Sequence, residues 1–141
     1  MNFIRKALYI TVFVLCALPL TAQDNLSEDD IFRLVDAASV RQFEEFGINY
    51  RQVLGDPARF LHNNTFLLCD SAIWNVTAKV VEAFGNVRIV QDGTMLSSES
   101  AIYLIDQNVV RFNGPLVELV DKEGNTLRSN RMAYNTKDSV A

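Results

Sequence analysis

The pentapeptide DSAIW at residues 70–74 recurs as ESAIY at residues 99–103. In both copies a glycine lies 13 residues after the alanine, at Gly85 and at Gly114, so the two copies are offset by 29 residues. A fixed offset of this size is typical of folds in which one supersecondary unit stacks on the next. The sequence therefore predicts a repeat protein rather than one central core.

Partial copies extend the repeat on both sides. Residues 55–61 read as a degenerate copy of residues 85–90, and residues 132–138 resemble residues 102–107, so the unit recurs about every 30 residues. The chain ends inside its last copy, and we expect this to leave an unpaired strand edge. That edge either pairs with a strand of another domain or continues into a longer protein.

Each copy reads as two strands separated by turns. Apolar residues alternate with charged ones at Val81 and Ala83 and again at Val87 and Ile89, which gives each strand one apolar face. The Asp-Gly pair at residues 92–93 is a hairpin signal. Such signals alternate along the chain and predict an all-β fold of antiparallel strands.

In two other copies the apolar pair sits one place later, at Val117 and Leu119 and at Ala58 and Phe60. A proline closely follows the glycine in both of these copies. We expect a one-residue bulge at each proline, because a bulge would return the pair to the apolar face.

Residues 27–46 are ambiguous. Apolar residues from Ile31 to Ala38 have helical spacing, whereas the position of this segment one repeat upstream favours a strand. We predict a strand from Ile31 to Phe43, followed by a turn at residues 46–47.

The first 22 residues are predicted to be a secretory signal peptide. Two basic residues precede an apolar run at residues 7–20, and its 14 residues are fewer than the roughly 20 that a membrane-spanning helix needs. An uncleaved membrane anchor of a transport component and a lipoprotein modified at Cys16 are the alternatives. We expect a flexible leader at residues 23–30 and a domain at residues 31–141, with its last repeat incomplete.

Composition argues against several classes of function. The chain has 141 residues, too few for a large multidomain enzyme. Without the two basic residues of the signal peptide, 11 basic residues remain against 17 acidic ones, a formal charge of −6. This acidic balance provides no excess of basic residues to bind the phosphate backbone of a nucleic acid, so we expect no nucleic-acid partner.

Catalytic chemistry has few residues to draw on. His62, in a predicted turn at residues 61–65, is the only imidazole, and Cys69 is the only thiol after the signal peptide. A Ser-His-Asp set, a His-rich metal site and an internal disulfide are therefore disfavoured, and Cys69 reads as a small buried apolar residue. We expect no enzymatic activity, no catalytic or metal-binding residue and no cofactor; a carboxylate-pair hydrolase is the remaining enzymatic alternative.

The larger residues of the repeat also recur. Aromatic or acidic side chains stand at equivalent positions in different copies, which is typical of turn or ladder structure rather than of a binding site. These residues are Asp70, Trp74, Glu99, Tyr103 and Tyr134.

Four motifs carry a family resemblance: LCDSA at 68–72, EAFGNVRI at 82–89, QDGT at 91–94 and YNTK at 134–137. In their order and spacing they resemble the OstA-like family, which is related to the lipopolysaccharide transport protein LptA and to the N-terminal domain of LptD. The resemblance covers residues 31–141. The end of the signal peptide, LTAQ at residues 20–23, resembles sequences processed by exporters of Bacteroidetes.

The resemblance implies an open β-jellyroll, a folded stack of antiparallel strands whose apolar interior shields acyl chains. It implies a periplasmic protein that binds lipopolysaccharide or a related glycolipid and hands it towards the outer membrane. Other jellyroll domains are the implied partners, through head-to-tail strand pairing. The alignment of the copies gives the expected groove residues: Phe60, Val81, Ala83, Val87, Ile89, Val110, Phe112, Val117 and Leu119.

A structural alternative remains: a β-solenoid assembly or adhesion module with a closed core and no lipid ligand. The same strand alternation produces a filled interior and a lined groove. The variants Val87→Asp and Phe112→Asp separate the two, because a closed core should unfold whereas a groove should keep its fold and lose lipid.

Overall fold

The computed structural model describes residues 28–141, in which antiparallel strands form a single sheet. The helical segments of this part of the chain are two 3-10 turns, η1 (Glu28–Asp30) and η2 (Ile105–Gln107). None of the described helices is long and apolar enough to cross a membrane. The all-β prediction is confirmed by eight strands: β1 (Arg33–Asp36), β2 (Ser39–Glu45), β3 (Ile48–His62), β4 (Thr65–Asn75), β5 (Val80–Gln91), β6 (Thr94–Leu104), β7 (Val109–Val120) and β8 (Thr126–Asn135).

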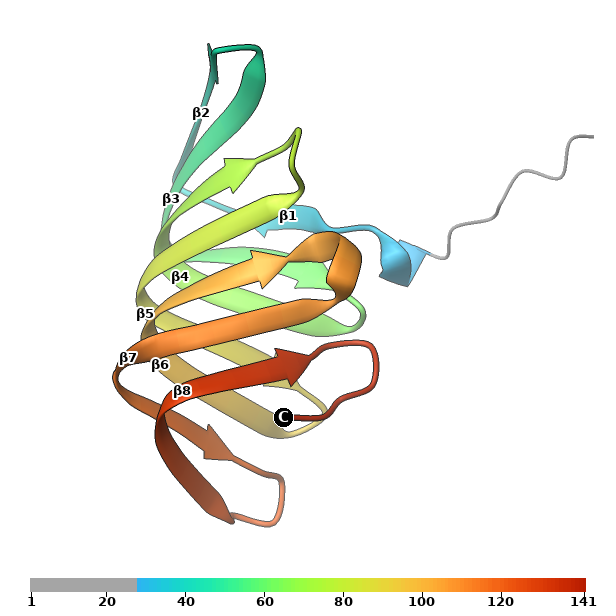
Figure 1. Ribbon diagram of the computed structural model, residues 1–141, viewed down its shortest axis with the longest axis vertical. Coiled ribbons are helices and arrows are strands. Elements are labelled where there is room, and N and C mark those ends of the chain that lie inside the picture. Colours follow the sequence, from blue (N-terminus) through green and yellow to red (C-terminus); the bar gives the residue numbers. More distant parts are fainter. Residues whose placement is uncertain (1–27) are drawn as a thin grey trace, which may run out of the picture.

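The strands lie in sequence order, β1-β3-β4-β5-β6-β7-β8, and β2 also pairs with β3. β1 and β2 pair with different halves of β3 and together form one edge of the sheet, while β8 forms the other edge (Figure 1). The two edges do not pair with each other, so the sheet is open. This confirms the predicted open β-jellyroll.

Each long strand bends where its pairing register is interrupted. β3 advances four residues from Leu54 to Ala58, while β4 advances two from Ser71 to Cys69. Interruptions occur in all the strand pairs from β3/β4 to β7/β8. In Figure 1 the bends form a line on the left, which we call the spine, and most hairpin turns lie on the right, which we call the mouth.

The bends divide the sheet into two facing half-sheets that are joined at the spine. Half-sheet A contains β2 and residues 48–54, 71–75, 80–84, 100–104, 109–113 and 131–135. Half-sheet B contains β1 and residues 58–62, 65–69, 87–91, 94–98, 117–120 and 126–129.

Register shifts just before Ala58 and Val117 confirm the positions of the predicted bulges. Their predicted size is wrong, because β3 and β7 each advance four residues there while the neighbouring strand advances two. The larger bulge has two effects. It returns the apolar pair to the interior, and it turns the strand from one half-sheet to the other.

Gly85 lies on the spine with φ at +76°, in the left-handed region. A Cβ at this position would lie 2.6 Å from Oδ2 of Asp70 on the neighbouring strand. The same Oδ2 accepts a hydrogen bond from Asn86 Nδ2 at 3.0 Å. Glycine therefore allows both the backbone conformation and the close approach of adjacent bends.

Several hairpins have two consecutive residues with positive φ: Phe46-Gly47 (51° and 76°), Asn63-Asn64 (51° and 55°) and Asp92-Gly93 (46° and 80°). Two such residues define the type I′ turn, whose twist matches that of the flanking strands. The predicted turns at residues 46–47 and 92–93 are confirmed.

The ambiguous N-terminal segment forms strands, as predicted in preference to a helix. The expectation of one strand from Ile31 to Phe43 is wrong, because β1 ends at Asp36 and β2 begins at Ser39. Between them the Ala38 N–H donates to the carbonyl oxygen of Leu54 at 2.8 Å, at the bend of β3. This edge of the sheet is therefore interrupted between β1 and β2, at the level where the other strands bend.

Inward side chains of both half-sheets form one apolar core. Cys69 belongs to it, fully buried, and burial, together with the nearby Asp70 carboxylate, raises the pKa of its thiol to about 12. The interpretation of Cys69 as a buried apolar residue is confirmed. The predicted signal peptide, its Bacteroidetes-like end and most of the predicted leader lie outside the described residues.

Candidate functional site

The residues predicted to line a groove all lie on the inner walls of the jellyroll. Eight of them have an exposed fraction of at most 2%, and Leu119 is half-buried against the core. Half-sheet A contributes Val81, Ala83, Val110 and Phe112, and half-sheet B contributes Phe60, Val87, Ile89, Val117 and Leu119. Contact of these side chains with lipid stays a prediction.

The inner walls are tightly packed. Val87, Ile89, Val110 and Val117 each have an exposed fraction of 0%, which leaves no room for a water molecule beside them. The interior is therefore filled by its own side chains. An acyl chain can enter only if side chains at the mouth move or the half-sheets separate.

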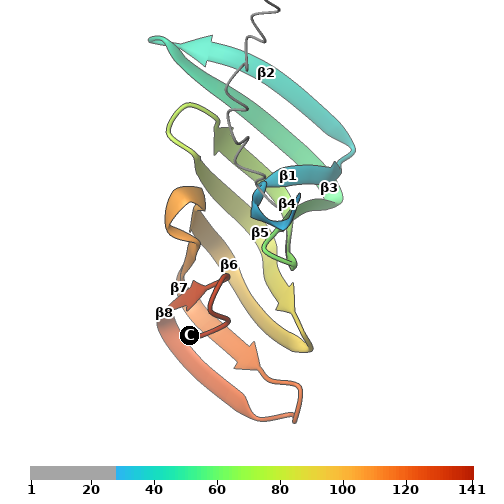
Figure 2. The ribbon, with the colours of Figure 1, turned by 90° about the vertical axis from the view of Figure 1, so that its right-hand side faces the viewer.

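Two segments lie across the mouth, which faces the viewer in Figure 2. Near one end of the molecule, η1 and β1 cross in front of β3 and β4. Near the other end, the residues after β8 fold back over the interior, where Asn135 and Val140 form a β-bridge. The mouth is thus covered by chain segments outside the main strands.

Phe32, between η1 and β1, fills the mouth with an aromatic ring that is 8% exposed. Its ring centroid lies 5.3 Å from that of Phe60, in a stacked arrangement, and 5.9 Å from that of His62, both on half-sheet B. From half-sheet A, Trp74 and Tyr103 approach edge-on at 5.1 and 5.3 Å. One ring therefore joins the two walls.

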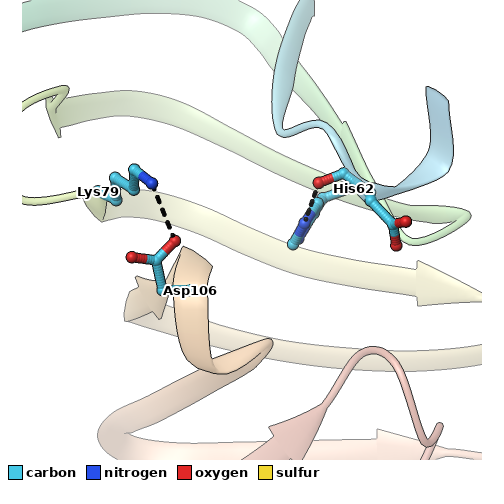
Figure 3. Close-up of polar contacts among 4 residues, drawn as sticks. His62, Lys79 and Asp106 are labelled. Carbon is cyan, nitrogen blue, oxygen red and sulfur yellow. Dashed lines mark hydrogen bonds and ion pairs between the residues drawn. The ribbon is translucent and has the colours of Figure 1, made fainter. Parts of the chain in front are cut away.

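A buried hydrogen-bonded network joins the rims of the mouth beside Phe32. The Tyr103 hydroxyl lies 2.6 Å from His62 Nδ1 and 2.9 Å from Thr136 Oγ1. His62 Nε2 lies 3.2 Å from the Asp30 carbonyl oxygen, a contact drawn in Figure 3. A carbonyl only accepts, so Nε2 donates and Nδ1 accepts from Tyr103.

Asn63 and Gln91 extend the network. Asn63 Nδ2 donates to Thr136 Oγ1 at 3.0 Å and to Asn108 Oδ1 at 2.8 Å. Gln91 Nε2 donates to the carbonyl oxygens of Asn63 and Thr136, at 3.0 and 2.9 Å, and Tyr134 donates to Gln91 Oε1 at 2.6 Å. Within residues 28–141, no buried side-chain nitrogen or oxygen lacks a partner. We call these residues the mouth network: His62, Asn63, Gln91, Tyr103, Asn108, Tyr134 and Thr136.

His62 is the last residue of β3 and is 3% exposed, because the predicted turn at residues 61–65 contracts to the two asparagines. Burial lowers the pKa of the imidazole below its usual value, against the opposing effects of the Asp30 carbonyl and carboxylate. Burial also raises the pKa of the Tyr103 hydroxyl. Both side chains are thus neutral at neutral pH and act as hydrogen-bonding groups.

The recurring aromatic residues occupy ladder positions in paired strands, as their repetition predicts, and their side chains also face the interior. Trp74, Tyr103 and Tyr134 lie in one inward row of half-sheet A and alternate there with Val81 and Val110. Their recurrence is the sequence signal that could have identified the mouth. Sequence reasoning missed the other parts of the closure: Phe32, Asn63, Gln91, Asn108 and Thr136.

The outer surface carries two clefts of about 550 Å³ each. One follows the spine beside Asp70 and Glu99, and the other lies beside Phe84 and Ile102 on half-sheet A. No group of three or more His, Cys, Asp or Glu side chains in the described part of the chain is arranged to hold a metal ion. An arrangement typical of metal-dependent catalysis is thus not found among these residues.

The fold and the interior together define a class of protein, the open β-jellyroll whose strands bend at a shared spine around an apolar interior. The family model of the OstA-like proteins matches residues 32–141. The chain therefore belongs to the OstA-like family.

A solved structure supports the same fold. It is the crystal structure of LptH from Pseudomonas aeruginosa, described as the LptA homologous periplasmic component of the conserved lipopolysaccharide transport device. The match has a TM-score of 0.65 and 19% sequence identity, and it covers 81% of this chain and 83% of that chain. No curated protein matches the chain significantly in sequence.

Proposed function

We propose that the chain is a periplasmic carrier that binds lipopolysaccharide or a related glycolipid and shields its acyl chains between the half-sheets on the way to the outer membrane. The observation that carries this proposal is the continuity of the apolar interior from one open edge to the other. One inward row runs Val40, Val53, Ala72, Ala83, Ala101, Phe112 and Met132. The facing row runs Leu34, Phe60, Leu67, Ile89, Leu96, Leu119 and Leu127.

Apolar walls of this kind suit acyl chains. Burial of apolar surface contributes about 25 cal/mol per Å², so a chain enclosed along one row gains affinity without a charged partner. The formal charge of −6 outside the signal peptide also favours binding through acyl chains over binding through lipid phosphates. The enzymatic alternative finds no comparable support.

The two open edges support head-to-tail assembly with other jellyroll domains. Val40 on β2 and Leu127 on β8 belong to the inward rows, yet they are 45% and 55% exposed because no further strand covers them. Both edges also bend at the level of the spine, so an added strand can follow both half-sheets. Such pairing would satisfy the edge backbone groups and cover both side chains.

Photo-crosslinking in cells tests lipid binding. A photoreactive amino acid at Ile89 or Phe112, on the inner walls, should capture lipopolysaccharide. The same amino acid at Ile102, which faces outward and is 42% exposed, is the matched control and should capture none. A domain that remains folded and captures no lipid at either inner position would sink the proposal.

A closed-core structural module is the second candidate, and the packed interior favours it. The aspartate variants Val87→Asp and Phe112→Asp do not decide between the two functions. Both wild-type side chains are buried, at 0% and 2% exposure, so a buried carboxylate would destabilise either kind of protein. Capture of lipid at the inner walls discriminates instead, together with mass spectrometry of lipid carried by the purified protein.

A further inference from the structure

The main strands of the sheet form the site that the Phe32 ring occupies. Phe32 itself belongs to the segment between η1 and β1, outside those strands. In the inward row of half-sheet A, Val81 lies between Trp74 and Tyr103. A valine between two larger aromatic residues leaves a depression in the wall. The Phe32 ring contacts both aromatic residues at the edges of this depression and stacks on Phe60 of the opposite wall.

Apart from the packing of Phe32 and Leu34 against the core, few contacts hold the segment that carries Phe32. β1 has four residues and pairs with β3 at three positions, with an irregularity between Leu34 and Asp36. Its ion pair, Arg33 with Glu28 at 4.0 Å, is exposed on both sides and contributes little. Beyond these contacts, one hydrogen bond from His62 to the Asp30 carbonyl ties the segment to the mouth network. Phe32 can therefore leave without disturbing the pairing of β3 to β8.

We propose that the aromatic slot lined by Phe60, Trp74 and Tyr103 is an acyl-chain-binding site, and that Phe32 occupies it until one acyl chain displaces the segment at residues 28–36. This inference rests on the proposed function. The slot suits a single chain, because it is walled by the ring face of Phe60 and the edges of Trp74 and Tyr103 and opens at the mouth. A polar headgroup can stay outside while the methylene groups take the place of the Phe32 ring.

The chain contains its own reporter for this site. Trp74 is the only tryptophan, and its ring lies 5.1 Å from that of Phe32. Bromine atoms quench tryptophan fluorescence on contact, so the probe is stearate that carries two bromine atoms in mid-chain. Saturable quenching is expected with brominated stearate, and unlabelled stearate should reverse it by competition.

Removal of the competing ring should strengthen binding. Phe32→Ala is expected to lower the apparent dissociation constant about tenfold, because the fraction of molecules with an open slot rises. The matched control is Phe46→Ala, at the tip of the β2–β3 hairpin, where the ring is 94% exposed. Phe46→Ala should leave the quenching curve unchanged.

A reversible tether tests displacement with Phe32 still present. Arg33 and Leu61 are register partners on β1 and β3, so cysteines at both positions can form a disulfide that holds the segment in place. Cys16→Ser removes one competing thiol, and Cys69 is buried. The oxidised protein should show no quenching, and reduction should restore it. If Phe32→Ala does not fold, the double-cysteine protein still tests whether the segment must be displaced for binding.

Equilibrium dialysis with radiolabelled stearate, run on the same samples, separates the two proposals. Two outcomes would overturn the slot and leave the carrier function standing: radiolabelled stearate binds while brominated stearate does not quench Trp74, or radiolabelled stearate binds equally well to the oxidised and reduced forms. Neither stearate nor lipopolysaccharide bound to any form, the reduced double-cysteine protein included, would overturn both.

Discussion

The Tyr103 hydroxyl lies 2.6 Å from Nδ1 of His62, and this contact joins half-sheet A to half-sheet B at the mouth. Tyr103 belongs to β6 and His62 to β3, two strands that are not neighbours in the sheet. Thr136 Oγ1 lies on the other side of the hydroxyl at 2.9 Å, from the segment after β8. Side-chain hydrogen bonds, rather than strand pairing, therefore help to close the mouth.

Tyr103→Phe keeps the ring and removes the hydroxyl. His62 Nδ1 loses a buried hydrogen-bond donor, and Thr136 loses one of its contacts, so we expect the free energy of unfolding to fall by about 1–3 kcal/mol. Urea denaturation measures the loss. Tyr50→Phe is the control, because the Tyr50 ring stacks on Phe43 in the β2–β3 hairpin, away from the mouth, and should change stability by about 0.5 kcal/mol or less. Equal losses in the two variants would contradict the role of the network.

Stability should fall as the pH drops below 6.5, the usual pKa of histidine. Burial lowers the pKa of His62 in the folded protein, so between that lower value and 6.5 the unfolded chain binds more protons. Below the folded pKa the effect levels off. His62 is the only histidine, so His62→Gln should lack this component, and the difference in unfolding free energy between the wild type and the variant should shrink with falling pH. Parallel pH profiles would refute the prediction.

Local pattern predicted the walls of this fold, and distant contacts that it could not predict close the mouth. Alternation at Val81 and Ala83 places those side chains inward because strand periodicity is a property of neighbouring residues. The slipped pairs at Ala58 and Val117 likewise mark the bends. Phe32 gives no such signal, because its partners come from three other strands.

The sequence pattern also could not identify the polar members of the mouth network. Asn63 follows a strand and reads as a turn residue, and it is one, with φ at 51°. Its amide nevertheless reaches Thr136, 73 residues away, and Gln91 reaches the same residue from another strand. Only the folding of the sheet at its spine brings these residues together. A polar residue at a strand end therefore has a role that pattern alone does not reveal.

Gly47 and Gly85 have the same φ of +76° but different surroundings. Alanine substitutions at the two positions therefore distinguish the cost of backbone strain from the cost of a steric contact. Gly47→Ala meets no atom within 4 Å, so it should cost only the strain of a left-handed alanine, about 1–2 kcal/mol. Gly85→Ala adds a contact with Asp70 Oδ2 at 2.6 Å and should cost about 1–3 kcal/mol more. Asp70→Ala combined with Gly85→Ala should recover part of the excess. Equal costs for the two single variants would show that the spine relaxes around a methyl group.

Cys69 should resist alkylation in the folded protein. Its thiol is fully buried, and burial raises its pKa to about 12, so almost no thiolate exists at neutral pH. Iodoacetamide, followed by mass spectrometry, should modify Cys69 slowly before urea is added and rapidly in urea. Fast modification without urea would mean that the core opens readily around β4.

Head-to-tail pairing should continue both inward rows from one copy to the next, which places Val40 beside Met132 and Leu127 beside Leu34 of the neighbouring copy. Val40 and Leu127 are half exposed at opposite edges, so stacking of a second copy would bury both. A photoreactive amino acid at either position should give crosslinked dimers at high protein concentration, and mapping of the crosslinks should place them between β2 or β1 and β8. Ile102, at the centre of the outer face, is the control and should give none. Crosslinks that join β8 to β8, or crosslinks at Ile102 of equal yield, would exclude head-to-tail assembly through these edges.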